Sequence, residues 1–304
     1  MIKSLSDLKK FNEILKQNNS SNVPNIFTKE WKKIKTSNEK PSNYINTIQI
    51  DYFDFINKVI EQDIIFVKNF VESVYLGNVY LLKNAITKKE IDFIKREFNS
   101  FAKKNESTFH KIYEGVPNFH RLIDEVNPKY TLEHIKHSYY LFPWNKENSG
   151  LRKLLINLHR PLKFAAGLSP MEFEKNTPKD EVVERIQVVR YIKNGFIEPH
   201  LDPVGYLNLV FSVYLSKRGD PNDYIKGGFN VFNKNEKKID LEEFIDQGDM
   251  GLFFPSLKHS VEAVDVKEEK NNSSSENGRW WIGYNIIHSD HVKGEERNTT
   301  RPLK

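Results

Sequence analysis

The segment Pro199-His200-Leu201-Asp202-Pro203 contains a histidine and an aspartate two positions apart. In an extended strand, residues two apart point to the same side, so the imidazole of His200 and the carboxylate of Asp202 would face one space. A neutral imidazole and a carboxylate on one side supply two of the three protein ligands of a facial iron(II) site. The complete set of three ligands leaves three coordination positions of the metal open. His259 is the candidate for the third ligand.

A His-x-Asp pair is a weak signal by itself, because about 0.5 such pairs are expected by chance in a chain with this many histidines. A second pair, His288-Ser289-Asp290, has no histidine far enough downstream to supply a distal ligand. The alternative for His200 is an ordinary structural histidine. The choice between these two interpretations therefore depends on the residues around His200.

The sequence around His200 alternates between apolar and polar residues, which is typical of β-strands. Between residues 207 and 215 the odd positions are all apolar, whereas Asn208, Ser212 and Tyr214 occupy even positions. One face of this strand would pack in a core, and the other face would be polar, as a site requires. The strand-like runs and the glycine turns between them are residues 186–191, 207–215, 227–228, 248–249 and 279–285.

These pieces follow one another in a defined order that ends with His259 and then Gly278-Arg279. In this order, residues 186–287 resemble the catalytic core of the 2-oxoglutarate/Fe(II)-dependent oxygenases, nearest to the prolyl 4-hydroxylase-like branch. The resemblance covers about a third of the chain. It implies an α+β fold, mostly β with N-terminal helices, around a double-stranded β-helix (a cupin-like jelly roll).

The resemblance also implies roles for individual residues. Arg279 would bind the distal carboxylate of 2-oxoglutarate, and Tyr214 and Tyr191 would line the cosubstrate pocket. The residues implied as iron(II) ligands, and therefore as the catalytic centre, are His200, Asp202 and His259. Iron(II), 2-oxoglutarate and dioxygen are the expected cofactors, and the planar fork of an arginine suits a buried carboxylate better than a lysine does.

The region before the predicted barrel is expected to contain helices. Residues 4–18 carry apolar side chains at helical spacing, and Thr87 with Glu90 forms a capping box ahead of a second amphipathic helix. From residue 181 the apolar period changes to two, which places the jelly-roll core at residues 181–288. We therefore expect a helical extension over residues 1–76, packed on or leading into the core, and an oxygenase domain over residues 77–304.

Two polar segments interrupt these elements. Residues 18–24 are expected to form a linker. Residues 266–277 are expected to form a polar loop inserted between two strands, because the spacing from His259 to Arg279 is longer than is usual in the family.

Composition limits the remaining possibilities. The chain has 304 residues, of which 29% are charged and 38% hydrophobic, as is ordinary for a soluble globular protein. Without cysteine, disulfides and thiolate metal sites are excluded, and no apolar run is long enough for a membrane span. A cytoplasmic location is expected, since no signal peptide is recognisable. The net charge of +5 is spread rather than gathered in a stripe, so a nucleic-acid partner is not expected; the oligomeric state is not predicted.

The expected function is oxidation of an unactivated C–H bond of a small polar metabolite or natural-product intermediate, with release of succinate and CO2. The alternatives are modification of a protein or peptide side chain, as by prolyl hydroxylases, and a jelly-roll binding protein without enzymatic activity. A nucleobase demethylase of this superfamily would carry a second arginine six positions after Arg279, where this chain has Asn285. A related halogenase would lack the carboxylate of Asp202.

Residues 118–145 are the candidate substrate wall, because they combine aromatic, hydroxyl and cationic side chains. An ordinary strand and turn supporting the barrel is the alternative interpretation. A closed wall of this kind favours a small molecule over a peptide, which needs an open groove. The residues predicted to contact substrate are Arg121, His137, Tyr139, Trp144 and, from the last strand, Asn285.

Overall fold

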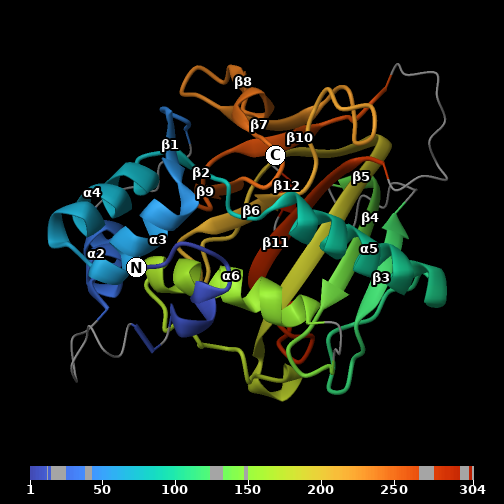
Figure 1. Cartoon of the computed structure of the whole chain (residues 1–304), viewed down its shortest axis with the longest axis horizontal. Helices are drawn as coiled ribbons and strands as arrows, with labels where there is room; N and C mark the ends of the chain where they lie inside the picture. Colours follow the sequence, from blue (N-terminus) through green and yellow to red (C-terminus); the bar gives the residue numbers. More distant parts are fainter. Residues whose placement is uncertain are drawn as a thin grey trace.

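One long strand, β5 (Val182–Leu201), belongs to both layers of the fold. Along its first half it pairs antiparallel with β11 (Arg279–His288) on one side and with β4 (Glu133–Leu141) on the other. Near its end it pairs with β10 (His259–Glu262). β5 therefore joins two largely antiparallel layers that curl toward each other, which is the arrangement of a jelly roll (Figure 1).

The computed structural model describes residues 1–11, 13–14, 25–37, 43–123, 133–146, 150–266, 277–294 and 301–302. The larger layer has the strand order β1-β2-β9-β6-β11-β5-β4-β3, and the smaller layer continues from β5 through β10 and β7 to β8. The pairing of β1 with β2 is parallel, and β12 pairs with the end of β5. The remaining strands are β1 (Thr47–Asp51), β2 (Val79–Lys83), β3 (Phe119–Ile123), β6 (Val210–Tyr214), β7 (Gly228–Phe232), β8 (Lys238–Asp240), β9 (Met250–Phe253) and β12 (Arg301–Pro302).

The strand expected at residues 186–191 is longer in the structure, because β5 bends and continues to the end of the barrel. The bend lies at Asn194, which adopts a left-handed conformation with φ of 66°. Gly195 follows, and a Cβ there would lie 2.3 Å from the carbonyl oxygen of Ile135 on β4. Only glycine allows this close approach of two backbones, so the bend that carries β5 into the second layer depends on it.

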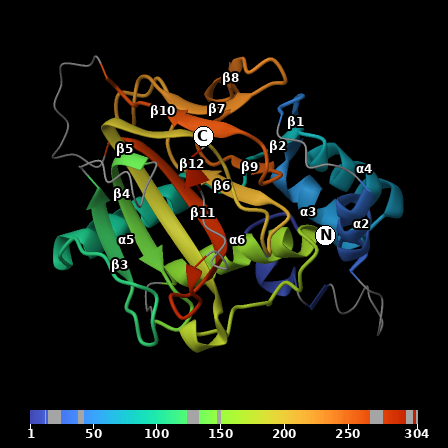
Figure 2. The same cartoon turned by 180° about the vertical axis from the view of Figure 1, so that it is seen from behind.

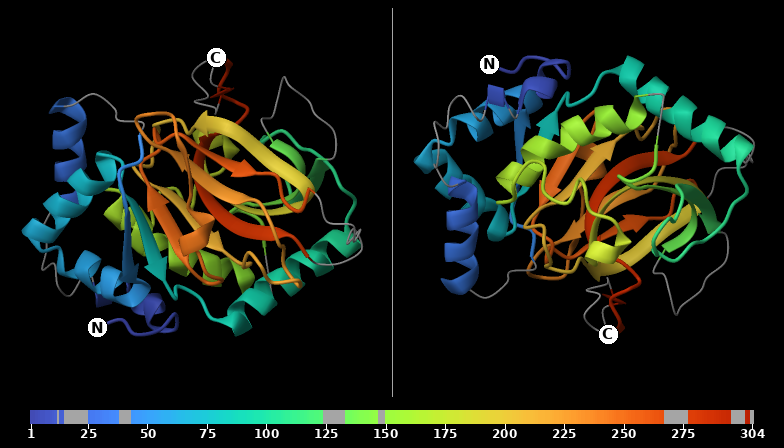
Figure 3. Two further views of the ribbon diagram at one scale, coloured as in Figure 1. Left: turned by 90° about the horizontal axis from the view of Figure 1, so that it is seen from above. Right: turned by 90° about the horizontal axis from the view of Figure 1, so that it is seen from below.

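The two faces of the larger layer have different neighbours. The outer face packs on α5 (Lys88–Lys104) and α6 (Leu151–Ala165), which cross it as Figure 3 shows, and Figure 2 shows the strands in front of these helices. The odd positions from Leu209 to Leu215 lie in this outer cluster, as their alternation predicts. The inner cluster gathers Val189, Tyr191, Tyr214 and residues of β7 and β10.

The helices near the N-terminus lie at the β1 edge of the larger layer and share its hydrophobic cluster (Figure 1). They are α2 (Ile26–Ser37), α3 (Tyr52–Glu61) and α4 (Ile64–Tyr75), and the short 3-10 turns are η1 (Asp7–Lys10), η2 (Pro178–Asp180) and η3 (Glu242–Phe244). The capping box of Thr87 and Glu90 is present at the start of α5. None of the helices in the described ranges has the length and apolar character needed to cross a membrane.

Three predicted features lie partly or wholly outside the described residues. The helix expected over residues 4–18 begins as the 3-10 turn η1, and most of its second half lies outside the described residues. The predicted linker at residues 18–24 and most of the predicted loop at 266–277 also lie outside them.

Candidate metal and cosubstrate site

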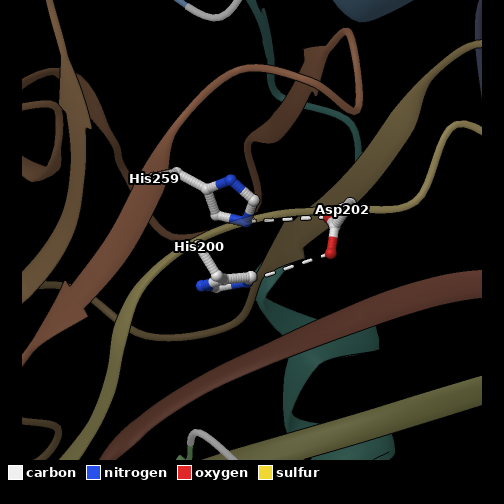
Figure 4. Close-up of side chains that lie close together, drawn as sticks. All are labelled: His200, Asp202 and His259. Atoms are coloured by element: carbon white, nitrogen blue, oxygen red, sulfur yellow. Dashed lines mark ion pairs between the residues drawn. The ribbon is translucent and has the colours of Figure 1, made fainter. Parts of the chain in front are cut away.

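The three predicted metal ligands converge at the end of β5 (Figure 4). His200 and His259 are directly opposite each other in the antiparallel register of β5 and β10. Asp202 lies just beyond β5, where its backbone N–H donates to the carbonyl of Pro255 and fixes the turn. The Nε2 atoms of His200 and His259 lie 3.9 Å and 3.6 Å from the Asp202 carboxylate oxygens, and one ligand atom of each residue lies within 4.8 Å of the others.

Both imidazoles are held in the form that a metal requires. The Nδ1 of His200 donates to the carbonyl of Glu198 at 2.7 Å, and the Nδ1 of His259 donates to the carbonyl of Leu257 at 2.8 Å. These bonds leave the lone pair on Nε2, which faces Asp202. Burial, together with the neighbouring His259, lowers the pKa of His200 to about 4, so its ring is neutral at physiological pH. Two imidazoles and one carboxylate in this arrangement are the donor set that a facial site for iron(II) requires.

The second His-x-Asp pair does not form such a centre. The Nε2 of His288 is hydrogen-bonded to the hydroxyl of Tyr206 at 2.9 Å, and the carboxylate of Asp290 accepts from the backbone N–H of Ile112 at 2.6 Å. Within the described ranges, only His200, Asp202 and His259 come together as a group of three metal-binding side chains.

Arg279 lies inside the barrel with 2% of its surface exposed, and it forms an ion pair with Glu242. Its Nε lies 3.1 Å and 3.0 Å from the two carboxylate oxygens of Glu242, and its Nη2 lies 2.9 Å from one of them. Glu242 also accepts from the hydroxyl of Tyr224 and from the backbone N–H of Phe229. Glu242 thus fixes one edge of the guanidinium, and a second carboxylate would meet it at Nη1.

Three buried polar groups lie near Arg279: the hydroxyls of Tyr191 and Tyr214 and the indole N–H of Trp281. The hydroxyl of Tyr214 has no hydrogen-bond partner in the described part of the chain, whereas the indole N–H of Trp281 is directed at the hydroxyl of Tyr191. Tyr191 is the cross-strand partner of Arg279, and Tyr214 is the partner of Trp281. Burial raises the pKa of Tyr191, and the charges of Arg279 and Asp202 both act on it. Tyr191 therefore lies within electrostatic reach of the cation and of the triad, with a protonated hydroxyl that can donate.

Shared neighbours connect the triad with Arg279. The ring of Phe229 lies 5.8 Å from that of His259, and the backbone N–H of Phe229 donates to Glu242. The guanidinium of Arg279 lies 5.6 Å from the ring centre of Tyr214. The two predicted parts of the site, three metal ligands and one arginine with phenols, therefore line one interior.

The residues predicted to contact substrate lie at different places in the structure. Asn285 lines a cavity of about 230 Å³ together with Asp202, so it lies beside the triad. Arg121 has the register of the inner face on β3, and its guanidinium lies over Phe109 at 5.0 Å. Trp144 instead stacks on Phe142 at 4.8 Å and donates its indole N–H to the carbonyl of Val116.

His137 and Tyr139 lie on the other face of β4, in the layer between sheet and helices. Tyr139 packs on Phe98 of α5 and on Trp280, and its hydroxyl is hydrogen-bonded to His137 at 3.2 Å. Burial, with a contribution from Arg190, lowers the pKa of His137 to about 3, so the ring carries no charge with which to bind an anion at neutral pH. The structure does not bring these two side chains to the face that carries the triad.

Two residues of this interior were not predicted from the sequence. Arg185 shares the inner face with Tyr191, and the alternation 185, 187, 189, 191 along one strand is a signal that could have identified it. Glu242 follows a short strand and belongs to no recognisable motif. Its role depends on the tertiary contact with Arg279.

We expect Glu242→Gln to destabilise the fold while leaving the metal ligands intact. Removing one member of a buried ion pair leaves the other charge uncompensated, which costs about 3–5 kcal/mol. The turn at Gly228 is shaped around this carboxylate, since a Cβ there would lie 2.6 Å from it. Unfolding in urea should show the lower free energy of unfolding. The matched control is Glu243→Gln, at the exposed neighbouring position. Equal stability of the two variants would contradict a structural role for the Glu242–Arg279 pair.

No protein-family model matches the chain, and no curated protein shows significant sequence similarity to it. Among solved structures, a Pseudomonas putida prolyl-4-hydroxylase is similar with 12% identity and a TM-score of 0.40, covering 75% of this chain and 100% of that one. A full-length Neurospora crassa protein in complex with alpha-KG has 14% identity and a TM-score of 0.46, covering 84% of this chain and 88% of that one.

A 2OG-Fe(II) oxygenase family oxidoreductase from Burkholderia pseudomallei has 14% identity and a TM-score of 0.40, covering 76% of this chain and 94% of that one. Similarity at these levels does not establish function, which therefore has to be inferred from the residues of the site itself.

Proposed function

We propose that this chain is an iron(II) and 2-oxoglutarate dependent oxygenase. The observation that carries the proposal is the convergence of His200, Asp202 and His259 at one end of a barrel whose interior holds Arg279. Such a triad leaves three coordination positions open, as a chelating cosubstrate and dioxygen require. Bound at this site, iron(II) with 2-oxoglutarate would activate dioxygen, with release of succinate and CO2 as the C–H bond of a substrate is oxidised.

The protein residues would bind and orient the cosubstrate. Arg279, held on one edge by Glu242, would offer Nη1 to the distal carboxylate of 2-oxoglutarate. Tyr191 and Tyr214, whose buried hydroxyls donate to no described residue, would donate hydrogen bonds to its oxygens. Their pKa values are raised by burial, so both hydroxyls keep their protons at neutral pH.

The proposed substrate is a small polar molecule. The cavity beside Asp202 has a volume of about 230 Å³ and contains polar groups from Arg185, Asn285, Tyr206 and His288. It is smaller than the roughly 300–1,000 Å³ of pockets for drug-sized ligands, so it suits a molecule of amino-acid or sugar size. A protein or peptide side chain inserted into the same cavity is the second candidate.

The activity is tested by supplying iron(II), 2-oxoglutarate and dioxygen and measuring succinate, with a panel of small metabolites and, separately, of peptides. We expect succinate to form faster with a small metabolite than without one, and no turnover in the Asp202→Ala variant. Stimulation by peptides alone would favour the second candidate. Failure to form succinate under any condition, together with failure to bind iron, would contradict the proposed function.

A further inference from the structure

The cavity beside the triad has one wall that carries positive charge. Arg185 and Asn285 lie next to each other on this wall, because they are cross-strand partners of β5 and β11. Tyr206 and His288 line the cavity as a hydrogen-bonded pair. Asp202, the metal ligand, lies on the same cavity. A molecule bound here would therefore contact an arginine and an amide while it lies beside the metal centre.

Two neutral side chains contact the guanidinium of Arg185. Its Nη2 donates to the side-chain oxygen of Gln187 at 2.9 Å, and the guanidinium lies over the ring of Tyr140 at 5.2 Å. Gln187 in turn contacts Ser138 on β4. These contacts hold the charged end of the arginine within the cavity wall.

Two further basic side chains share this inner face. Lys136 pairs with Tyr191 across β4 and β5, and Arg121 pairs with Ser138 across β3 and β4. Lys136 is fully buried, and burial together with the positive charges of Arg185 and Arg121 holds its pKa well below the usual range. Among the described residues, the guanidinium groups of Arg185 and Arg121 therefore place positive charge on this side of the barrel.

The described residues that line the cavity carry little negative charge. Among the described residues that line the cavity, Asp202 is the single acidic side chain. A divalent metal bound by the triad would offset that charge. With metal present, the cavity is expected to attract anions.

We propose that the substrate carries an anionic group, a carboxylate or a phosphate, that pairs with Arg185 and accepts a hydrogen bond from Asn285. The planar fork of arginine fits either anion with two parallel hydrogen bonds. The Tyr206–His288 pair, on the same cavity, offers a hydroxyl and a ring nitrogen to a further polar group of the substrate. This inference rests on the proposed function and narrows its substrate class.

The test uses the full-length protein with iron(II) and 2-oxoglutarate, and measures succinate above the rate without added compound. The panel contains amino acids, hydroxy acids and sugar acids, each beside its primary amide, and sugar phosphates, each beside the free sugar. We expect stimulation by an anionic member and not by its neutral counterpart. The acid arm and the phosphate arm identify which anion is recognised.

Variants then assign the recognition to Arg185. Arg185→Gln should raise the KM of the stimulating compound at least tenfold, whereas Arg185→Lys, which keeps the charge and loses the fork, should raise it less. The matched control is Arg190→Gln, because Arg190 lies on the same strand but on its outer face, over the ring of Trp280 at 5.4 Å. Iron content is measured for each variant to verify that the triad is intact.

The outcomes separate the two claims. The inference is overturned if no anionic member stimulates succinate formation, if neutral counterparts stimulate equally, or if Arg185→Gln and Arg190→Gln have the same KM. If the protein neither binds iron nor forms succinate from 2-oxoglutarate, the proposed function fails, and this inference fails with it.

Discussion

Replacing His259 with alanine is expected to abolish stoichiometric iron(II) binding and all turnover. Only two ligands would remain, because the Nε2 of His259 lies 3.6 Å from the carboxylate of Asp202 and no further described histidine belongs to this group. The same loss is expected for His200→Ala and Asp202→Ala. Iron per protein, measured after anaerobic loading and gel filtration, is the direct readout.

The matched control for this prediction is His288→Ala. His288 also belongs to a His-x-Asp pair, but its Nε2 is engaged with Tyr206 and it joins no group of three ligands among the described residues. This variant should bind iron with wild-type stoichiometry. Iron retained at full occupancy in His259→Ala would contradict the assignment of the triad.

The second large effect is expected from removing Arg279, the cation that we propose to bind the cosubstrate. Arg279→Ala should weaken 2-oxoglutarate binding by about 2–5 kcal/mol, or roughly 30- to several-thousand-fold, because the distal carboxylate would lose its charged partner in a buried pocket. Iron binding should survive. Titration of 2-oxoglutarate into the metal-loaded protein under anaerobic conditions measures the change.

A single variant at this position also leaves Glu242 as an uncompensated buried charge, so the effect on folding has to be separated from the effect on binding. The double variant Glu242→Gln/Arg279→Gln removes both charges together and is expected to fold better than Arg279→Ala. It should still bind iron and still fail to bind 2-oxoglutarate tightly. Wild-type affinity in the double variant would show that another cation holds the distal carboxylate.

Local alternation explains why the convergence of the three candidate ligands was predictable. His200 and Asp202 are two residues apart at the end of a strand, and such spacing brings side chains to one side whatever the rest of the fold does. His259 begins a later strand, and the register of β10 against β5 places it opposite His200. The order of strands and glycine turns was enough to predict that these three side chains converge and that the strands form jelly-roll layers.

The substrate side was less predictable because both faces of β4 are buried. Ser138 and Lys136 face the barrel interior, while His137 and Tyr139 face the helices, and all four are largely inaccessible to solvent. Alternation shows that neighbouring residues face opposite ways, but it does not show which face is the interior when neither is exposed. The aromatic density of this segment therefore did not distinguish a pocket wall from a supporting layer.

The Glu242–Arg279 pair required the tertiary structure. The two residues are 37 positions apart, in η3 and β11, and neither lies in a pattern that specifies the other. Their contact arises because the turn after β8 and the start of β11 meet inside the barrel. Long-range polar pairs of this kind leave no periodic signal in the sequence.

The most direct test of the central claim is the anaerobic visible spectrum of the protein with iron(II) and 2-oxoglutarate. If the triad holds iron and the cosubstrate chelates it, a weak visible charge-transfer band should appear only when both are present. The band should be absent in His259→Ala and should require much more 2-oxoglutarate in Arg279→Ala. Iron-loaded wild-type protein that shows no such band at saturating 2-oxoglutarate would contradict the account.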